Sequence, residues 1–98
     1  MSELKITRED QPTRGRYVAT IDGIDAEAEL TFSRASDTLI IADHTGVPDA
    51  FRGRGVGHAL FLRLVSDARA NGVKIVPLCP FVNAERQKHP ESGDVFQS

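Results

Sequence analysis

Three alternate glycines stand between a stretch with the pattern of a buried strand and one with the pattern of an amphipathic helix. The glycines lie in the run Phe51-Arg52-Gly53-Arg54-Gly55-Val56-Gly57-His58. Before this run, residues 38–43 are nearly all apolar, as in a strand that is covered on both faces. After it, apolar residues recur at helical spacing from position 56 to Asn71-Gly72, a typical helix stop. The sequence therefore predicts a strand, a glycine-rich loop and a main helix in succession.

A second strand is expected after the helix, at residues 74–79. A strand, a helix and another strand in succession imply a right-handed crossover and a parallel pair. Upstream, residues 16–21 and 26–32 have β-prone patterns and are separated by a turn at residues 22–25, so antiparallel strands should precede the crossover. These patterns predict an α+β domain with an α/β-like core and a mixed sheet.

The two ends of the chain show weaker patterns. Residues 1–13 are polar and predict a partly flexible lead-in with one early strand at residues 4–7. A short helix is expected at residues 82–88, stopped by His89-Pro90, and residues 91–98 are expected to form a polar tail. All 98 residues are expected to belong to a single domain, because a chain of this length has no room for a second core.

Charge and composition exclude several classes of protein. Twelve basic and fourteen acidic residues give a formal net charge of −2, so no overall field favours nucleic acid. No apolar stretch approaches the roughly 20 residues that cross a bilayer, and the N-terminus lacks the apolar segment of a signal peptide. No membrane partner and a cytoplasmic location are therefore expected. One cysteine and three scattered histidines show no metal-ligand spacing, so no metal site is predicted.

The glycine-rich run has the composition of an anion-binding loop. Glycines let successive backbone N–H groups face a ligand, and the first turn of a helix adds unpaired donors and partial positive charge. Arg52 and Arg54 can add charge that suits phosphate oxygens. The run lacks the Gly-Lys-Ser/Thr of nucleotide hydrolases, and His58 stands where the dinucleotide pattern requires a small residue. A pyrophosphate site of another kind is predicted, and the alternative is a flexible turn with solvated arginines.

The run resembles the acetyl-CoA loop of the GNAT acetyltransferase superfamily, Arg/Gln-x-x-Gly-x-Gly/Ala, in the form Arg52-Gly53-Arg54-Gly55-Val56-Gly57. Two further stretches, Val47-Pro48-Asp49-Ala50-Phe51 and Val76-Pro77-Leu78-Cys79-Pro80-Phe81-Val82, resemble the small YjdJ-type branch of that superfamily, as does His89-Pro90 after them. The resemblance implies a compact GNAT-like mixed sheet whose two parallel strands splay apart around the pantetheine arm of acetyl-CoA. It also implies that the pyrophosphate lies on the loop from Arg52 to His58.

The same resemblance implies two further contacts to the cofactor. Backbone groups near Val47 should pair with the pantetheine amides. Asn83 matches an asparagine that hydrogen-bonds the cofactor in many GNAT domains. The alternative for Asn83 is a helix N-cap, a position that asparagine serves well.

Two residues are candidates for catalysis. Cys79 is expected at the carboxyl end of the strand that flanks the thioester, and the resemblance implies a possible acetyl acceptor there. The alternative is a small buried side chain, because no base stands near Cys79 in the sequence. His44, at the end of the apolar strand, is a candidate general base for direct transfer, since imidazole titrates near neutral pH; the alternative is a strand-end surface histidine. Glu29 is a further candidate, and Tyr17, the only tyrosine, does not stand where larger members carry a proton donor.

The predicted function is transfer of an acetyl group from acetyl-CoA to a primary amine of a small molecule or a protein. Larger members of the superfamily have extra helices between the first two strands, whereas here only a short turn separates them, so the acceptor site is expected to be open. The alternative is a non-catalytic CoA-binding or interaction module, which the lack of an evident base favours. A third interpretation is an anion-binding adaptor without specificity for CoA.

Overall fold

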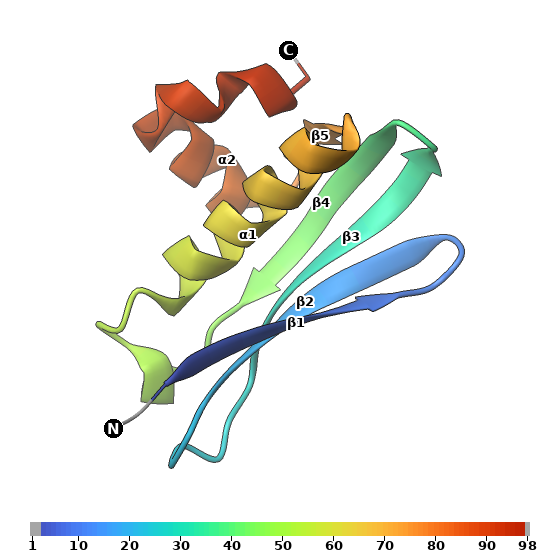
Figure 1. The fold of residues 1–98 in the computed structure, drawn as a ribbon. Helices are drawn as coiled ribbons and strands as arrows, with labels where there is room; N and C mark the ends of the chain where they lie inside the picture. The colour runs from blue at the N-terminus through green and yellow to red at the C-terminus, as the bar shows by residue number, and fades with distance from the viewer. Residues whose placement is uncertain (1–2, 98) are drawn as a thin grey trace.

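The chain forms a five-stranded sheet in which the strands lie side by side in sequence order (Figure 1). The computed structural model describes residues 3–97, and Met1, Ser2 and Ser98 lie outside the described residues. The strands are β1 (Leu4–Asp10), β2 (Arg14–Ile21), β3 (Ala28–Ser36), β4 (Leu39–Gly46) and β5 (Lys74–Val76). Neighbours are antiparallel from β1 to β4, and β5 runs parallel to β4. The predicted α+β class with a mixed sheet is confirmed.

Helix α1 (Val56–Asn71) makes the crossover between β4 and β5, with the bounds that the sequence predicts. A glycine in the left-handed conformation stands at each end, Gly55 with φ of 70° and Gly72 with φ of 66°. One face of the helix is buried and packs on β2 and β3; it consists of Val56, Leu60, Phe61, Leu64, Val65 and Ala68. The helical spacing of apolar residues thus marks the buried face. No helix within residues 3–97 is long and apolar enough to cross a bilayer.

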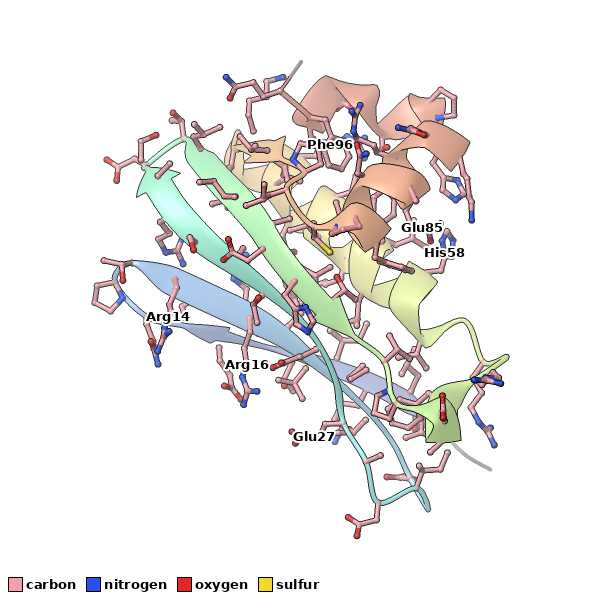
Figure 2. The ribbon with its side chains drawn as sticks, turned by 180° about the vertical axis from the view of Figure 1, so that it is seen from behind. Arg14, Arg16, Glu27, His58, Glu85 and Phe96 are labelled. Carbon is pink, nitrogen blue, oxygen red and sulfur yellow. The ribbon has the colours of Figure 1, made fainter. Side chains whose placement is uncertain are left out.

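Both α-helices lie on the same face of the sheet (Figures 1 and 2). Helix α2 (Pro80–Lys88) packs against β4, while α1 packs against β2 and β3. Along β4, Ile40 and Ala42 are buried under the helices, whereas Leu39 and Ile41 are only partly buried. The expectation that this strand is covered on both faces is wrong, because no element of the described chain covers its second face.

Near both ends of the described chain, the residues form more regular structure than their polar composition predicts. The lead-in expected at residues 1–13 is a strand over Leu4–Asp10, and it pairs with β2 along its whole length. At the other end, the 3₁₀ helix η2 (Pro90–Val95) is followed by Phe96, whose ring stacks on Phe61 with centroids 6.0 Å apart. The expectation of a polar tail is wrong over residues 91–97, because Val95 and Phe96 are buried and complete the core.

A β-bulge in the ladder of β3 and β4 decides which side chains share a face. Thr31 pairs with His44 and Phe32 with Ala42, so Asp43 is the extra residue. Directly paired residues point to the same face of a sheet. Phe32 and Ala42 belong to the core beneath the helices, whereas Thr31 and His44 lie on the face that the helices leave open.

Candidate functional site

The loop before α1 contains two glycines with left-handed backbone. After the short 3₁₀ helix η1 (Asp49–Phe51), Gly53 has φ of 77° and Gly55 has φ of 70°. Glycine adopts these angles freely, whereas residues with a Cβ rarely do. A Cβ built on either glycine would meet no atom within 4 Å. The loop therefore borders open space in front of the first turn of α1.

Several backbone N–H groups of this loop have no acceptor within residues 3–97. These are the amides of Gly53, Gly55, Val56, Gly57 and His58, whereas Arg54 N donates to Phe51 O and Ala59 N donates to Gly55 O. Unpaired amides at a helix N-terminus, where the helix also has partial positive charge, bind phosphate groups. The free donors and the space that a Cβ would fill both fit the pyrophosphate of CoA.

The third glycine of the run has a packing role as well. A Cβ on Gly57 would lie 2.7 Å from Cζ of Phe81, closer than real Cβ atoms approach a neighbour. The ring of Phe81, on α2, therefore rests against α1 at a point where only hydrogen fits. The sequence indicates that residue 57 is a glycine so that a phosphate can approach the backbone. Packing against Phe81 is a second reason for a glycine at this position.

Arg52 and Arg54 have exposed side chains at the rim of the loop. Arg52 Nη2 lies 3.1 Å from Asp49 Oδ1, but the two side chains are 81% and 92% exposed, so this ion pair contributes little to stability. The side chain of Arg54 makes no hydrogen bond or ion pair with any described residue. Both guanidinium groups can therefore turn toward a phosphate without breaking a strong contact.

The parallel strands β4 and β5 separate beside the loop. Their ladder ends at the pair Ile41 and Val76, and one further bond joins Cys79 N to Ala42 O at 2.8 Å. Residues 43–46 of β4 have no neighbouring strand on this side within the described chain. The free edge of β4 lies where the resemblance places the pantetheine arm.

Cys79 lies between this gap and the core. The residue is 3% exposed, and its Sγ donates to Thr45 Oγ1 at 3.3 Å. It stands at the N-cap of α2 rather than in β5, which ends at Val76 because Pro77 has no N–H to continue the ladder. A buried thiol of this kind has the surroundings of a packing residue, whereas a reactive cysteine is partly exposed and near a positive charge or a base.

His44 and Cys79 lie on opposite faces of the sheet. Successive residues of a strand point to opposite faces, and Thr45 contacts Cys79, so His44 turns away from it. His44 Nε2 lies 3.3 Å from the position that a Cβ on Gly46 would occupy. The structure therefore does not bring the two catalytic candidates together.

An open pocket of about 460 Å³ adjoins the end of β4. Its lining residues are Glu27, Glu29, Gly46, Val47 and Pro48. Glu29 Oε1 lies 3.0 Å from Arg16 Nη1, whereas the side chain of Glu27 forms no ion pair within residues 3–97, and Figure 2 shows Glu27 away from the helices. The pocket was not evident from the sequence. The only signal was the alternation that places Glu27 and Glu29 on one side of their strand.

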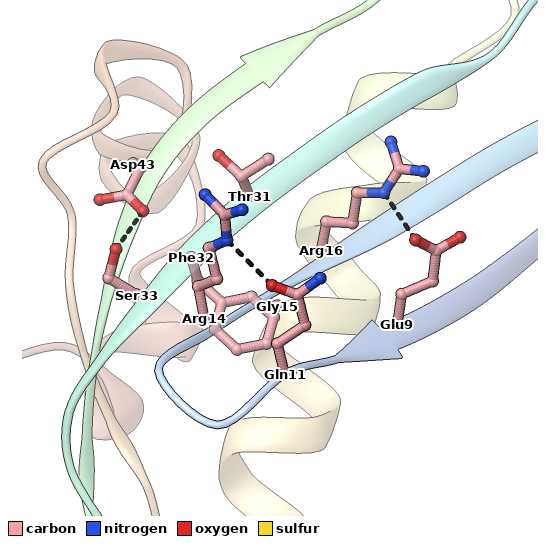
Figure 3. A pocket seen from close by; sticks show the side chains of 9 residues that line it. All are labelled: Glu9, Gln11, Arg14, Gly15, Arg16, Thr31, Phe32, Ser33 and Asp43. Atoms are coloured by element: carbon pink, nitrogen blue, oxygen red, sulfur yellow. Dashed lines mark hydrogen bonds and ion pairs between the residues drawn. The ribbon is translucent and has the colours of Figure 1, made fainter.

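A second pocket of similar volume lies over β1, β2 and β3 on the same open face (Figure 3). Its polar side chains bond to one another. The pairs are Arg16 Nε with Glu9 Oε1 at 2.8 Å, Arg14 Nε with Gln11 Oε1 at 3.0 Å, and Ser33 Oγ with Asp43 Oδ2 at 2.6 Å. Because these groups already satisfy one another, this pocket holds less free charge for a ligand than the pocket at Glu27.

Tyr17 belongs to a polar network beneath the second half of α1. Its hydroxyl donates to Asp67 Oδ2 at 2.8 Å, and Arg8 Nη1 donates to the same oxygen at 3.1 Å. Burial, and then the hydrogen bond to Asp67, raise the pKa of the Tyr17 phenol far above its ordinary value. This phenol therefore stays neutral in the core and does not serve the loop at the other end of α1.

The two remaining cofactor candidates contact protein groups. Asn83 lies inside α2, and its Oδ1 accepts a hydrogen bond from Arg86 Nε at 2.9 Å. The N-cap alternative for Asn83 is wrong, because the helix starts at Pro80, before the predicted residue 82. The imidazole of His58 turns toward α2, with Nδ1 3.2 Å from Glu85 Oε1 (Figure 2). His58 therefore offers the loop its amide and not its side chain.

The strand order, the single crossover and the glycine loop at its first helical turn define a GNAT-like α+β domain. A family model described as GCN5-related N-acetyl-transferase matches residues 16–95. The chain therefore belongs to the GCN5-related N-acetyltransferase family.

A solved structure supports the same assignment. The solution structure of a Staphylococcus aureus protein described as GCN5-like was determined by NMR, and that protein is 33% identical to this chain. The similarity covers 100% of this chain and 92% of that one, with a TM-score of 0.75. No curated protein sequence matches the chain. The predicted superfamily and its fold are thus confirmed.

Proposed function

We propose that this chain binds acetyl-CoA and transfers the acetyl group to a primary amine. The observation that carries the proposal is the loop before α1, where five amides lack acceptors within residues 3–97 and two left-handed glycines border open space. Family membership supports the same chemistry, as does the similarity to the S. aureus protein that is described as GCN5-like. The motifs at residues 47–51 and 76–82 support placement in the YjdJ-type branch.

Acetyl-CoA would lie across the loop and along β4. Its pyrophosphate would accept hydrogen bonds from the free amides between Gly53 and His58, and Arg52 and Arg54 would contact its outer oxygens. The pantetheine arm would follow the free edge of residues 43–46 and meet backbone groups near Val47, which is 39% exposed. Asn83 can still donate from Nδ2, because Arg86 occupies only its Oδ1.

The amine would approach from the open face of the sheet. Glu27, which forms no ion pair within residues 3–97, would attract a cationic amine, and His44, beside Gly46 of the same pocket, would accept its proton. The free amine would then attack the thioester carbonyl carbon, the nitrogen would release its second proton to solvent as the C–N bond forms, and the C–S bond would break. The thiolate so released would take a proton from solvent. The openness of the pocket fits amines of small molecules and of proteins alike.

Titration with CoA should shift the backbone amide resonances of Gly53 and of residues 55–58 before all others, because those N–H groups are free to bond to the pyrophosphate. Arg54→Ala should weaken CoA binding by about 1 to 3 kcal/mol, since it removes a charge-assisted contact. NMR titration of both proteins measures the two effects.

Arg14→Ala is the matched control for Arg54→Ala. Arg14 is also exposed, but it lies on the open face of the sheet and bonds to Gln11. Its loss should leave CoA affinity unchanged. A parent protein whose amides do not move at millimolar CoA would overturn the proposed function. Binding without amine-dependent turnover would instead support the non-catalytic alternative.

Cys79→Ser should retain acetyl transfer, because in direct transfer the thiol is not a nucleophile. The serine hydroxyl can keep the hydrogen bond to Thr45, so the fold should also survive. Amine acetylation rates and intact mass measure the outcome. A collapse of the rate in the variant, together with a gain of about 42 Da on the parent protein incubated with acetyl-CoA alone, would establish an acetyl-cysteine intermediate in place of direct transfer.

A further inference from the structure

We infer that His58, Glu85 and His89 form a binding site for a divalent transition-metal ion such as Zn²⁺. One ligand atom from each of these side chains lies within 4.8 Å of the others. The three residues come from the first turn of α1, the last turns of α2 and the residue that ends α2. Figure 2 shows His58 and Glu85 facing each other between the two helices. The cluster is separate from the free backbone N–H groups of the loop before α1, to which His58 contributes its amide but not its side chain.

The spacing of two of the ligand atoms already matches metal geometry. His58 Nδ1 and Glu85 Oε1 are 3.2 Å apart. Tetrahedral coordination with bonds of 2.0–2.1 Å separates neighbouring ligand atoms by about 3.3 Å. His89 completes the set from one helical turn beyond Glu85, and its ring centroid lies 4.9 Å from that of His58. A ligand atom of His89 lies within 4.8 Å of those of His58 and Glu85.

His89 also has the partner that metal-binding histidines use. Its Nδ1 lies 3.2 Å from Glu91 Oε1, so this nitrogen donates to a carboxylate and Nε2 keeps a free lone pair. Such a carboxylate orients the ring and increases its basicity as a ligand. Glu91 thus supports His89 Nε2 as the metal-binding atom.

Glu85 is a buried carboxylate that the proposed acetyl transfer does not use. The residue is 7% exposed, and beyond His58 its only charged contact within residues 3–97 is Lys88 Nζ, 3.9 Å from Oε2. Lys88 is 71% exposed and can keep this contact while Oε1 binds a metal. A buried carboxylate that contacts an imidazole and only a distant lysine is therefore available to bind a cation.

The donor set selects the kind of metal. Two imidazole nitrogens and one carboxylate oxygen suit Zn²⁺, whereas Mg²⁺ and Ca²⁺ prefer all-oxygen sites. Three protein ligands leave the fourth position to water, and the side chains of His58 and His89 are 43% and 31% exposed. The ion would tie the end of α2 to the turn of α1 that carries the phosphate loop.

The test is calorimetric titration of the tag-free full chain with ZnCl₂ alone. The parent should bind one ion per chain with micromolar or tighter affinity, and MgCl₂ should give no binding. His58→Gln and His89→Gln should each weaken Zn²⁺ binding by more than tenfold, and Glu91→Gln by about tenfold through loss of ring orientation. Circular dichroism checks that each variant is folded.

The third histidine provides the matched control. His44→Gln removes an imidazole from the other face of the sheet and should leave Zn²⁺ affinity unchanged. Absence of saturable binding by the parent would overturn the inference, and the His58–Glu85 contact would then be a simple hydrogen bond. Loss of binding in His44→Gln with retention in His58→Gln would also overturn it, because the ion would then lie elsewhere. Since no step of the test uses CoA, its outcome is independent of the proposed transferase activity.

Discussion

Gly55→Val should abolish measurable CoA binding while the protein remains folded. The wild-type φ of 70° is a left-handed angle that a β-branched residue adopts only with strain of about 1 to 2 kcal/mol or more. The valine side chain would also occupy the space in front of the free amides, which no atom fills within 4 Å of a built Cβ. Calorimetry or NMR titration with CoA measures the loss.

Gly72→Val separates loss of the site from loss of stability. Gly72 stands at the other end of the same helix, has φ of 66°, and also has open space around a built Cβ. The two variants therefore carry the same kind of backbone strain, and thermal denaturation should show similar losses of stability. Only Gly55→Val should lose CoA. If it binds CoA as tightly as Gly72→Val does, the pyrophosphate does not lie on this loop.

His44→Gln should lower kcat for amine acetylation by about 10²- to 10⁴-fold, the usual contribution of a general base. Glutamine keeps a polar side chain of similar reach but cannot accept the proton of the amine. CoA affinity should not change, because His44 points to the face away from the loop and α2. Initial rates at saturating acetyl-CoA and a polyamine acceptor measure the effect.

Glu27→Gln gives the matched comparison at the same pocket. Loss of this carboxylate should raise KM for a cationic amine and leave kcat nearly unchanged, because attraction of the amine is separate from proton transfer. A kcat for His44→Gln within about threefold of the parent would remove His44 from the mechanism, since a general base contributes far more than that. Proton transfer to solvent would then be the route to test.

Local patterns in the sequence were enough to predict the elements that carry the loop. Helix α1 has its predicted bounds because both signals lie within one short stretch of sequence. These are the helical spacing of apolar residues and the Asn71-Gly72 stop. The parallel order of β4 and β5 followed from the crossover rule, and the glycine run indicated a phosphate loop before its geometry was known. The superfamily could be named for the same reason, since its motif lies in one continuous segment.

The tertiary structure decided what depends on residues far apart in the chain. Register across the bulge at Asp43 placed His44 and Cys79 on opposite faces, and no pattern within one strand reveals its partner's register. Packing of α2 on α1 explains why residue 57 is a glycine, because the ring of Phe81 leaves no room for a Cβ there. The same packing brings His58 to Glu85, although the spacing of these residues in the sequence is not characteristic of any motif. Periodicity reports which side of an element is buried but not which element covers it. Contacts between elements therefore depend on the tertiary structure, whereas the glycine-rich loop and helix α1 can be predicted from the residues of one continuous segment.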